Sequence, residues 1–137
     1  MQINFLAIFV ATAVQFVIGA VWYMPLFGKL WGQIHGFDTL SKEEQIKAQK
    51  QMMPLLAIQF IMGLASVYVF STILAMLPEM IWYQLALWVW VGFMLPVQVS
   101  AVLFGGTEQK WIMKKLGVML GGSFVTFLGA AFILSLF

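Results

Sequence analysis

The side chains of this sequence that could do chemistry are few, and three glutamines placed well inside long apolar stretches stand out. Gln15, Gln59 and Gln98 are surrounded by residues that carry no charge. An amide in hydrocarbon needs hydrogen-bond partners, because an unpaired polar group there costs on the order of several kcal/mol. We therefore expect the three amides to face the protein interior and to bond to one another, to the backbone or to water. Two interpretations stay open: hydrogen bonds that hold helices together, or a small polar pocket.

The pocket interpretation also involves Ser100, on the third apolar stretch, and the aromatic pair Trp22 and Tyr23. Trp22 and Tyr23 stand just before Pro25, in a segment rich in aromatic residues. Such residues can act as interfacial anchors, because aromatic rings prefer the headgroup level and proline ends a membrane helix. Alternatively, they fold back to line the mouth of a pocket. The candidate binding residues are then Gln15, Trp22, Tyr23, Gln59, Gln98 and Ser100.

Residues suited to catalysis or metal binding are scarce. The chain has no cysteine and one histidine, His35, and no apolar stretch contains an ionisable Asp, Glu, Lys, Arg or His. We expect no catalytic residue, no metal site and no cofactor, and an intramembrane enzyme is the least favoured class. A small four-helix exporter requires a carboxylate within the membrane, which Gln15 does not supply. A passive channel stays open as an alternative, although no ring of charges is visible.

The composition indicates that most of the chain is surrounded by lipid rather than by water. Of its 137 residues, 63% are hydrophobic and 9% charged, against roughly 45–50% and about 25% in soluble domains. So few charges cannot cover the surface of a water-soluble protein, which excludes a soluble enzyme, a disordered segment and a nucleic-acid binder. The partners we expect are membrane lipids and no nucleic acid, and the sequence names no small-molecule ligand.

Four uncharged stretches are long enough to cross a bilayer as helices, which takes about 20 residues each. They cover about residues 4–24, 54–77, 81–104 and 116–137. Pro25, Pro78 and the pair Gly105–Gly106 mark the ends of the first three. The fold class predicted is all-α: a four-helix transmembrane bundle that forms a single domain over residues 1–137.

The lysines predict the orientation of this bundle. All seven basic residues are lysines, and they lie between the first and second spans or between the third and fourth. The positive-inside rule makes these two loops cytoplasmic and places both termini outside. In the first loop, Ser41-Lys42-Glu43-Glu44 has the pattern of a capping box. A helix therefore begins near Lys42, as a short interfacial helix or as an extension of the second span.

Small residues spaced by four mark one face of each span. Small side chains let membrane helices approach closely, since lipid supplies no hydrophobic drive for their association. Four short helices bury few residues among themselves, so faces left over would suit contacts between copies, and we expect a homo-oligomer. The predicted packing positions are Ala11, Gly19, Gly63, Gly92, Gly117, Gly121 and Gly122.

Two segments resemble a known family. The first contains Gly19, Trp22, Tyr23, the run Pro25-Leu26-Phe27-Gly28-Lys29 and Trp31; the second contains Leu95-Pro96 and Ala101-Val102-Leu103-Phe104. Together they are similar to small bacterial integral-membrane proteins described as a domain of unknown function, DUF1761. The resemblance implies a multi-pass protein of the bacterial inner (cytoplasmic) membrane and supplies no activity. The function we expect is a non-enzymatic, oligomeric binding, transport-like or accessory bundle with a polar pocket that faces the cytoplasm.

Overall fold

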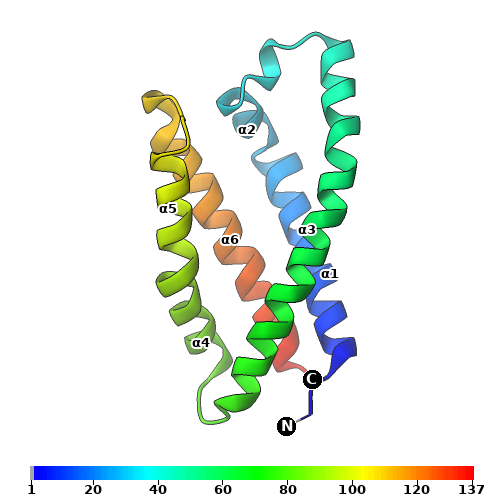
Figure 1. Cartoon of the computed structure of the whole chain (residues 1–137), viewed down its shortest axis with the longest axis vertical. Coiled ribbons are helices and arrows are strands. Elements are labelled where there is room, and N and C mark those ends of the chain that lie inside the picture. The colour runs from blue at the N-terminus through cyan, green and yellow to red at the C-terminus, as the bar shows by residue number, and fades with distance from the viewer. Residues whose placement is uncertain (1) are drawn as a thin grey trace.

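The computed structural model describes residues 2–137, which fold into helices joined by short turns and two longer loops (Figure 1). The prediction of an all-α fold is confirmed. The α-helices are α1 (Phe5–Val21), α2 (Gly28–Ile34), α3 (Lys42–Met76), α4 (Trp82–Val89), α5 (Leu95–Leu103) and α6 (Ile112–Ser135). Two π-helical segments, Trp22–Leu26 and Trp90–Met94, continue α1 and join α4 to α5.

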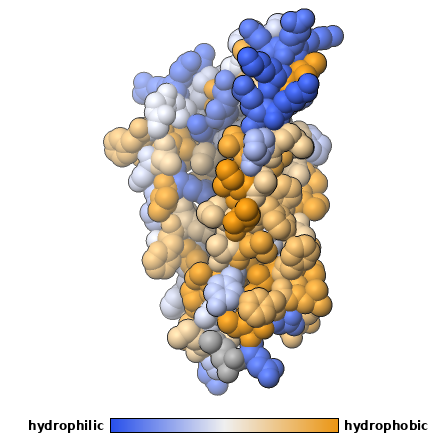
Figure 2. All heavy atoms as spheres, turned by 45° about the vertical axis from the view of Figure 1, so that its right-hand side comes forward, coloured by the Kyte–Doolittle hydropathy of each residue, from blue (hydrophilic) through white to orange (hydrophobic). Residues whose placement is uncertain are grey.

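Four of the resulting rods are long and apolar enough to cross a membrane, as predicted. They span Phe5–Leu26, Lys42–Met76, Trp82–Leu103 and Gln109–Ser135. Apolar side chains cover the middle of the molecule and hydrophilic ones gather at one end (Figure 2). Many of the apolar side chains are exposed in the isolated chain; Phe93, for example, is 74% exposed. Such a surface suits a lipid environment.

Helix α6 is the centre of the arrangement. It packs against α1, α3, α4 and α5. Both termini lie at one end of the bundle, here called the terminal end, and the two lysine-bearing connections lie at the other, the loop end (Figure 1). Helix α3 runs obliquely across the bundle, so that α3 and α5 diverge toward the loop end (Figure 1).

The tightest packing lies toward the terminal end. Ala11 and Ala131 are fully buried, and the rings of Phe70 and Phe127 meet edge to face with centroids 4.9 Å apart. Thr12 is buried there too, and its hydroxyl donates to the Ile8 carbonyl of its own helix at 2.8 Å. Because α1 and α6 bring small residues to their contact, their backbones approach closely. Helices α1, α3, α4 and α6 share this core.

The loop end corrects two predicted boundaries. Pro25 does not end the first span, because the chain continues as a π-helical turn in which the Phe27 amide donates to the Trp22 carbonyl at 2.9 Å. A bond over five residues accommodates a proline that has no N–H of its own. A short helix does follow the first span, but it is α2. Helix α6 begins at Ile112 rather than near residue 116.

The helix predicted to begin near Lys42 is confirmed, together with its capping box. The Ser41 hydroxyl accepts from the Glu44 amide at 3.2 Å, and the Glu44 carboxylate accepts from the Ser41 amide at 3.0 Å. The helix then runs without a break through Pro54 to Met76. It is therefore an extension of the second span, and the alternative of a separate interfacial helix after Ser41 is wrong.

Candidate functional site

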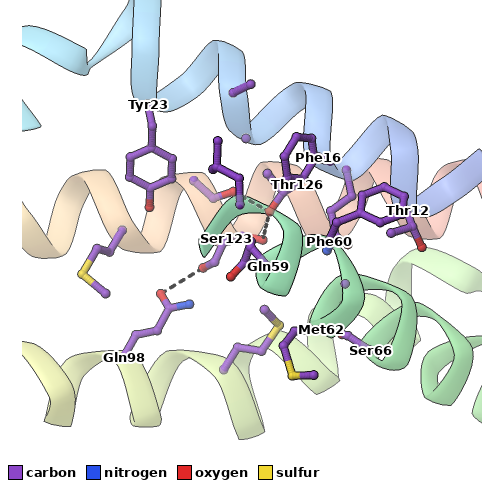
Figure 3. Close-up of a pocket in the computed structure, with 18 of the residues that line it drawn as sticks. Thr12, Phe16, Tyr23, Gln59, Phe60, Met62, Ser66, Gln98, Ser123 and Thr126 are labelled. Atoms are coloured by element: carbon purple, nitrogen blue, oxygen red, sulfur yellow. Dashed lines mark hydrogen bonds between the residues drawn. The ribbon is translucent and has the colours of Figure 1, made fainter. Parts of the chain in front are cut away.

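A cavity of about 530 Å³ lies between α1, α3, α5 and α6, on the loop-end side of the core. Its volume falls within the range of roughly 300–1,000 Å³ common for ligand pockets. Apolar side chains form most of the wall, and amides and hydroxyls are set among them (Figure 3). The polar residues of the lining are Thr12, Gln15, Tyr23, Gln59, Ser66, Gln98, Ser123 and Thr126.

The cavity brings together four of the six residues predicted from sequence. Gln15, Tyr23, Gln59 and Gln98 all contribute to its lining. In Figure 3, Tyr23, Gln59 and Gln98 point toward the same space from three different rods. Residues that lie 75 positions apart along the chain, such as Tyr23 and Gln98, are thereby made neighbours.

Trp22 and Ser100 lie outside the cavity, which corrects the prediction for both. The Trp22 indole turns to α6, where its Nε1 donates to the Val118 carbonyl at 2.9 Å. Gly121 and Gly122 make room for this ring, since a Cβ atom added to them would lie 2.7 Å and 2.9 Å from it. Ser100 is exposed on the outer side of α5.

The other predicted packing positions divide into two groups. A Cβ atom on Gly63 would lie 3.2 Å from Thr12 and 3.5 Å from the Gln15 amide oxygen, and one on Gly19 would lie 3.7 Å from Thr126. Gly92 and Gly117 differ, because each is exposed and a Cβ atom there would meet nothing within 4 Å. The expectation that these last two glycines pack inside the bundle is wrong for the single chain.

Both π-helical segments border the cavity. The segment Trp22–Leu26 contains Pro25 and presents Tyr23 and Met24, and the segment Trp90–Met94 precedes Pro96 and presents Met94. In the second segment the Leu95 amide donates to the Trp90 carbonyl, five residues back. Such single-turn π-bulges in α-helices recur at functional sites, because they redirect side chains without ending the helix.

A hydrogen-bonded chain fixes one wall of the cavity. The Trp90 indole Nε1 donates to the Ser123 hydroxyl at 2.9 Å, and the hydroxyl proton is shared between the Gln98 amide oxygen at 3.0 Å and the Leu120 carbonyl at 3.1 Å (Figure 3 draws the bond to Gln98). These hydrogen bonds join the rod made of α4 and α5 to α6. Of the three glutamines, Gln98 is thus held by a serine and not by another glutamine.

Gln15 and Gln59 behave differently. Among the side-chain hydrogen bonds of residues 2–137, none involves the amide of either residue. Gln15 is half-buried, and Gln59 is exposed at the surface of the isolated chain while it also contributes to the lining. Of the partners left open by the sequence, the three amides do not bond to one another, and those of Gln15 and Gln59 do not bond to the backbone of residues 2–137 either. Two of them are left available to a molecule that enters the cavity.

Sequence reasoning missed several lining residues, among them Ser123, Thr12 and Ser66. Periodicity gave a signal for two of them. Thr12 precedes Gln15 by three positions, and Ser66 follows Gln59 by seven, so each shares a helix face with a glutamine that was singled out. Ser123 had no such signal, because its partners Trp90 and Gln98 lie on another rod.

The ionisable groups near the loops are separate from this cavity. A second hollow, at the loop end, is lined by side chains of both signs. Lys110 and Glu108 form an exposed ion pair there, with 3.4 Å between Nζ and Oε2. The first cavity, by contrast, is lined without any Asp, Glu, Lys or His.

Residues 6–135 match the family described as a protein of unknown function, DUF1761. The chain belongs to the DUF1761 family. No curated protein and no solved structure matches it. The resemblance predicted from the two sequence segments is thus confirmed, and the match includes every residue of the cavity lining. The site described above therefore lies within the part of the chain that defines a DUF1761 protein.

Proposed function

We propose that this DUF1761 protein is a non-enzymatic, multi-pass protein of the bacterial inner membrane that binds a small molecule in its loop-end cavity, in a transport-like or accessory role. The observation that carries the proposal is the pair of unpartnered amides, Gln15 and Gln59, on the wall of a cavity of about 530 Å³. An amide left unpaired in an apolar medium costs free energy, and a bound ligand that pairs with it recovers that cost.

The alternative role for the glutamines, hydrogen bonds between helices, fits Gln98 alone. Its oxygen is held by Ser123 across a helix contact, an interaction worth roughly 0.6–2 kcal/mol in a membrane. Gln15 and Gln59 make no such contact with residues 2–137. A structural role therefore accounts for one amide of the three, and binding accounts for the other two.

The chemistry of the lining supports a binding role over catalysis or proton-coupled export. Its polar groups are amides, a phenol and aliphatic hydroxyls. Proton transfer and metal binding typically use histidines or carboxylates, and coupled exporters use a carboxylate within the membrane. Neutral hydrogen-bonding groups serve to hold and orient a ligand instead.

The lysines support an orientation in which the cavity lies in the cytoplasmic half of the membrane. All seven basic residues lie toward the loop end, in α2, in the first turns of α3 and α6 or just before α6, the side that the positive-inside rule makes cytoplasmic. The chain contains no cysteine, so single-cysteine variants give a direct test. We expect Lys47→Cys to react with a membrane-impermeant maleimide only after the cells are opened; labelling of intact cells would refute this orientation.

The outward-facing glycines support a homo-oligomer. Gly92 and Gly117 lie on different rods, and each is exposed with open space where a side chain would stand. Small residues of this kind commonly mark contacts between membrane helices. We expect crosslinking in a mild detergent to trap a discrete oligomer of the wild type, and Gly92→Leu to reduce it; a strictly monomeric wild type would contradict the proposal.

Filling the cavity tests the binding function itself. Ser66 lines the cavity on α3, whereas Val69, on the same helix, is 53% exposed and is not part of the lining. Ser66→Phe puts a ring into the cavity, and Val69→Phe puts the same ring on the outside. We expect native mass spectrometry of the wild type and of Val69→Phe to show a bound small molecule that is absent from Ser66→Phe. Equal occupancy in all three, or none in the wild type, would refute the function.

A further inference from the structure

We propose that the occupant of the cavity is an uncharged amphiphile: a molecule with a carbonyl or hydroxyl oxygen in its head and an apolar body that enters from the membrane. The inference rests on the proposed binding function and adds to it the chemical class of the ligand. Three properties of the cavity carry it: the lack of charge in its lining, the direction of the Gln98 amide, and the exposure of its α3 wall.

The lack of charge excludes an ionised head. The lining contains no side chain that could neutralise an ammonium, a carboxylate or a phosphate. The nearby Lys115 precedes Met119 of the lining by four positions of α6, about 6 Å along a helix, but it is not part of the lining and its Nζ lies over the Trp31 ring, 5.9 Å from the centroid. A charge placed in the membrane away from any partner costs roughly 2.5–3.5 kcal/mol or more. The cavity therefore selects neutral molecules.

The bonds at Ser123 orient the Gln98 amide. An indole N–H only donates, so the Ser123 hydroxyl accepts from Trp90, and its single proton is shared between the Gln98 oxygen at 3.0 Å and the Leu120 carbonyl at 3.1 Å. The NH₂ group of Gln98 then points into the cavity (Figure 3). A donor held in this way calls for an acceptor oxygen on the ligand.

Two further groups complete the polar part of the site. Gln59 projects from α3 opposite Gln98, and its free amide offers both a donor and an acceptor. The Tyr23 ring enters from the π-helical segment, and its hydroxyl lies close to Gly122, where a Cβ atom would be 3.1 Å away. A head such as a carboxamide, an ester or an alcohol can pair with these groups without leaving a buried polar atom unpaired.

The remaining wall suits an apolar body. Met62, Met94 and Met119 line the cavity together with Phe60. Methionine is flexible and polarisable, so such a wall adapts to chains of different shape. Met62 is 55% exposed, and α3 packs against α1 and α6 while diverging from α5. The cavity is thus open along α3, at a depth that lipid occupies, and an alkyl chain can enter from there.

Photolabelling with matched probes tests the class of ligand. Four diazirine probes share one alkyl chain and end in a carboxamide, a carboxylate, a trimethylammonium group or a methyl group. The wild type is labelled in nanodiscs, and peptide mass spectrometry compares labelling at Met94 and Met119 in the cavity with labelling at the exposed Phe93. We expect this ratio to be at least about tenfold higher for the carboxamide than for either charged probe, and about threefold or more higher than for the methyl probe.

Each alternative result has a distinct meaning. A charged probe that labels the cavity as well as the carboxamide refutes the neutral class but leaves the binding function standing. Equal labelling by the methyl probe refutes recognition of the head. Absence of cavity labelling by every probe overturns the binding function together with this inference.

Two glutamine variants and one control assign the recognition to the polar groups. Gln59→Leu and Gln98→Leu each remove an amide that faces the cavity, whereas Gln84→Leu removes an exposed amide of α4 that is not part of the lining. We expect the preference for the carboxamide over the methyl probe to fall about threefold to tenfold in the first two and to persist in Gln84→Leu. Because the Gln59 amide has no partner to lose, Gln59→Leu keeps the test valid if Gln98→Leu folds poorly. An unchanged preference in Gln59→Leu refutes the role of the amides.

Discussion

The two ends of the bundle are built from the same four rods, but one end is closely packed and the other contains a cavity. Toward the terminal end, apolar side chains from α1, α3, α4 and α6 interlock, and residues such as Ala11 and Ala131 have no exposed surface. Toward the loop end, α3 moves away from α5, and the space between the rods is a cavity of about 530 Å³. One end holds the fold together, and the other is left partly unfilled.

The two ends of the bundle differ in the types of residue that they bring to the space between the helices. Lipid provides no hydrophobic drive for helix association, so helices stay together where side chains interlock. At the terminal end the sequence supplies alanines and two phenylalanines that fit edge to face. At the loop end it supplies Gln15 and Gln59, whose amides have no partner among residues 2–137.

Truncating the core is the strongest test of this division. Phe127 is 3% exposed and packs on Phe70, whereas Phe93 is 74% exposed and faces outward. We expect Phe127→Ala to lower the free energy of unfolding by about 3 kcal/mol, mainly through lost packing, and Phe93→Ala to leave it nearly unchanged. The measurement is SDS-induced unfolding in mixed micelles. Equal losses in both variants would mean that the terminal end is not the stabilising part.

The glycines of α6 test the boundary between the two ends. An alanine at Gly122 would place Cβ 2.9 Å from the Trp22 indole and 3.1 Å from the Tyr23 hydroxyl, whereas the space around Gly117 is open. We expect Gly122→Ala to cost about 2 kcal/mol by overpacking. Gly117→Ala should be neutral or slightly stabilising, because alanine favours the helix. The same unfolding assay and the shift in tryptophan emission report both. A stable Gly122→Ala with unchanged emission would contradict the Trp22 contact.

The division between the ends was only partly predictable from sequence. Length and the absence of charge located all four rods, and the Ser41 capping box located the start of α3, because these signals are local. The direction of Trp22 was not predictable, since it depends on Gly121 and Gly122, about a hundred residues away. Long-range packing of this kind leaves no periodic trace in the sequence.

The positions of Gly92 and Ser100 were missed for a different reason. Small residues spaced by four were expected to face the bundle, but this face of the third span is exposed from its start. Trp88, one turn before Gly92 and ahead of the π-helical segment, is already 68% exposed. Gln98 faces the cavity, while Gly92 and Ser100 are exposed. Small side chains alone therefore do not distinguish a face that packs within the chain from one that faces outward. Pro25 was interpreted as an end of helix because the π-turn that accommodates it was not considered.

Removing the hydroxyl of Ser123 tests the one bonded wall of the cavity. This hydroxyl links Trp90 to Gln98, whereas the Thr72 hydroxyl bonds only to the Tyr68 carbonyl of its own helix, at 3.0 Å. We expect Ser123→Ala to cost about 1 kcal/mol, as is typical of hydrogen bonds between membrane helices. Thr72→Val should change stability by less than about 0.5 kcal/mol. If the two variants proved equal in the unfolding assay, the chain of bonds would not hold the rods together.

The smallest expected effect comes from comparing two amides of the loop end. Gln98 has a partner in Ser123 and Gln59 has none among residues 2–137, so the same substitution by leucine has different consequences for folding. We expect Gln98→Leu to cost about 1 kcal/mol, because the hydrogen bond between Gln98 and Ser123 that joins two rods is lost, and Gln59→Leu to cost less than about 0.5 kcal/mol or to stabilise. Both are measured by unfolding without added ligand. Unchanged stability in Gln59→Leu would support the proposed binding role of this amide, whereas a clear loss of stability would show that the loop end is held together by its amides.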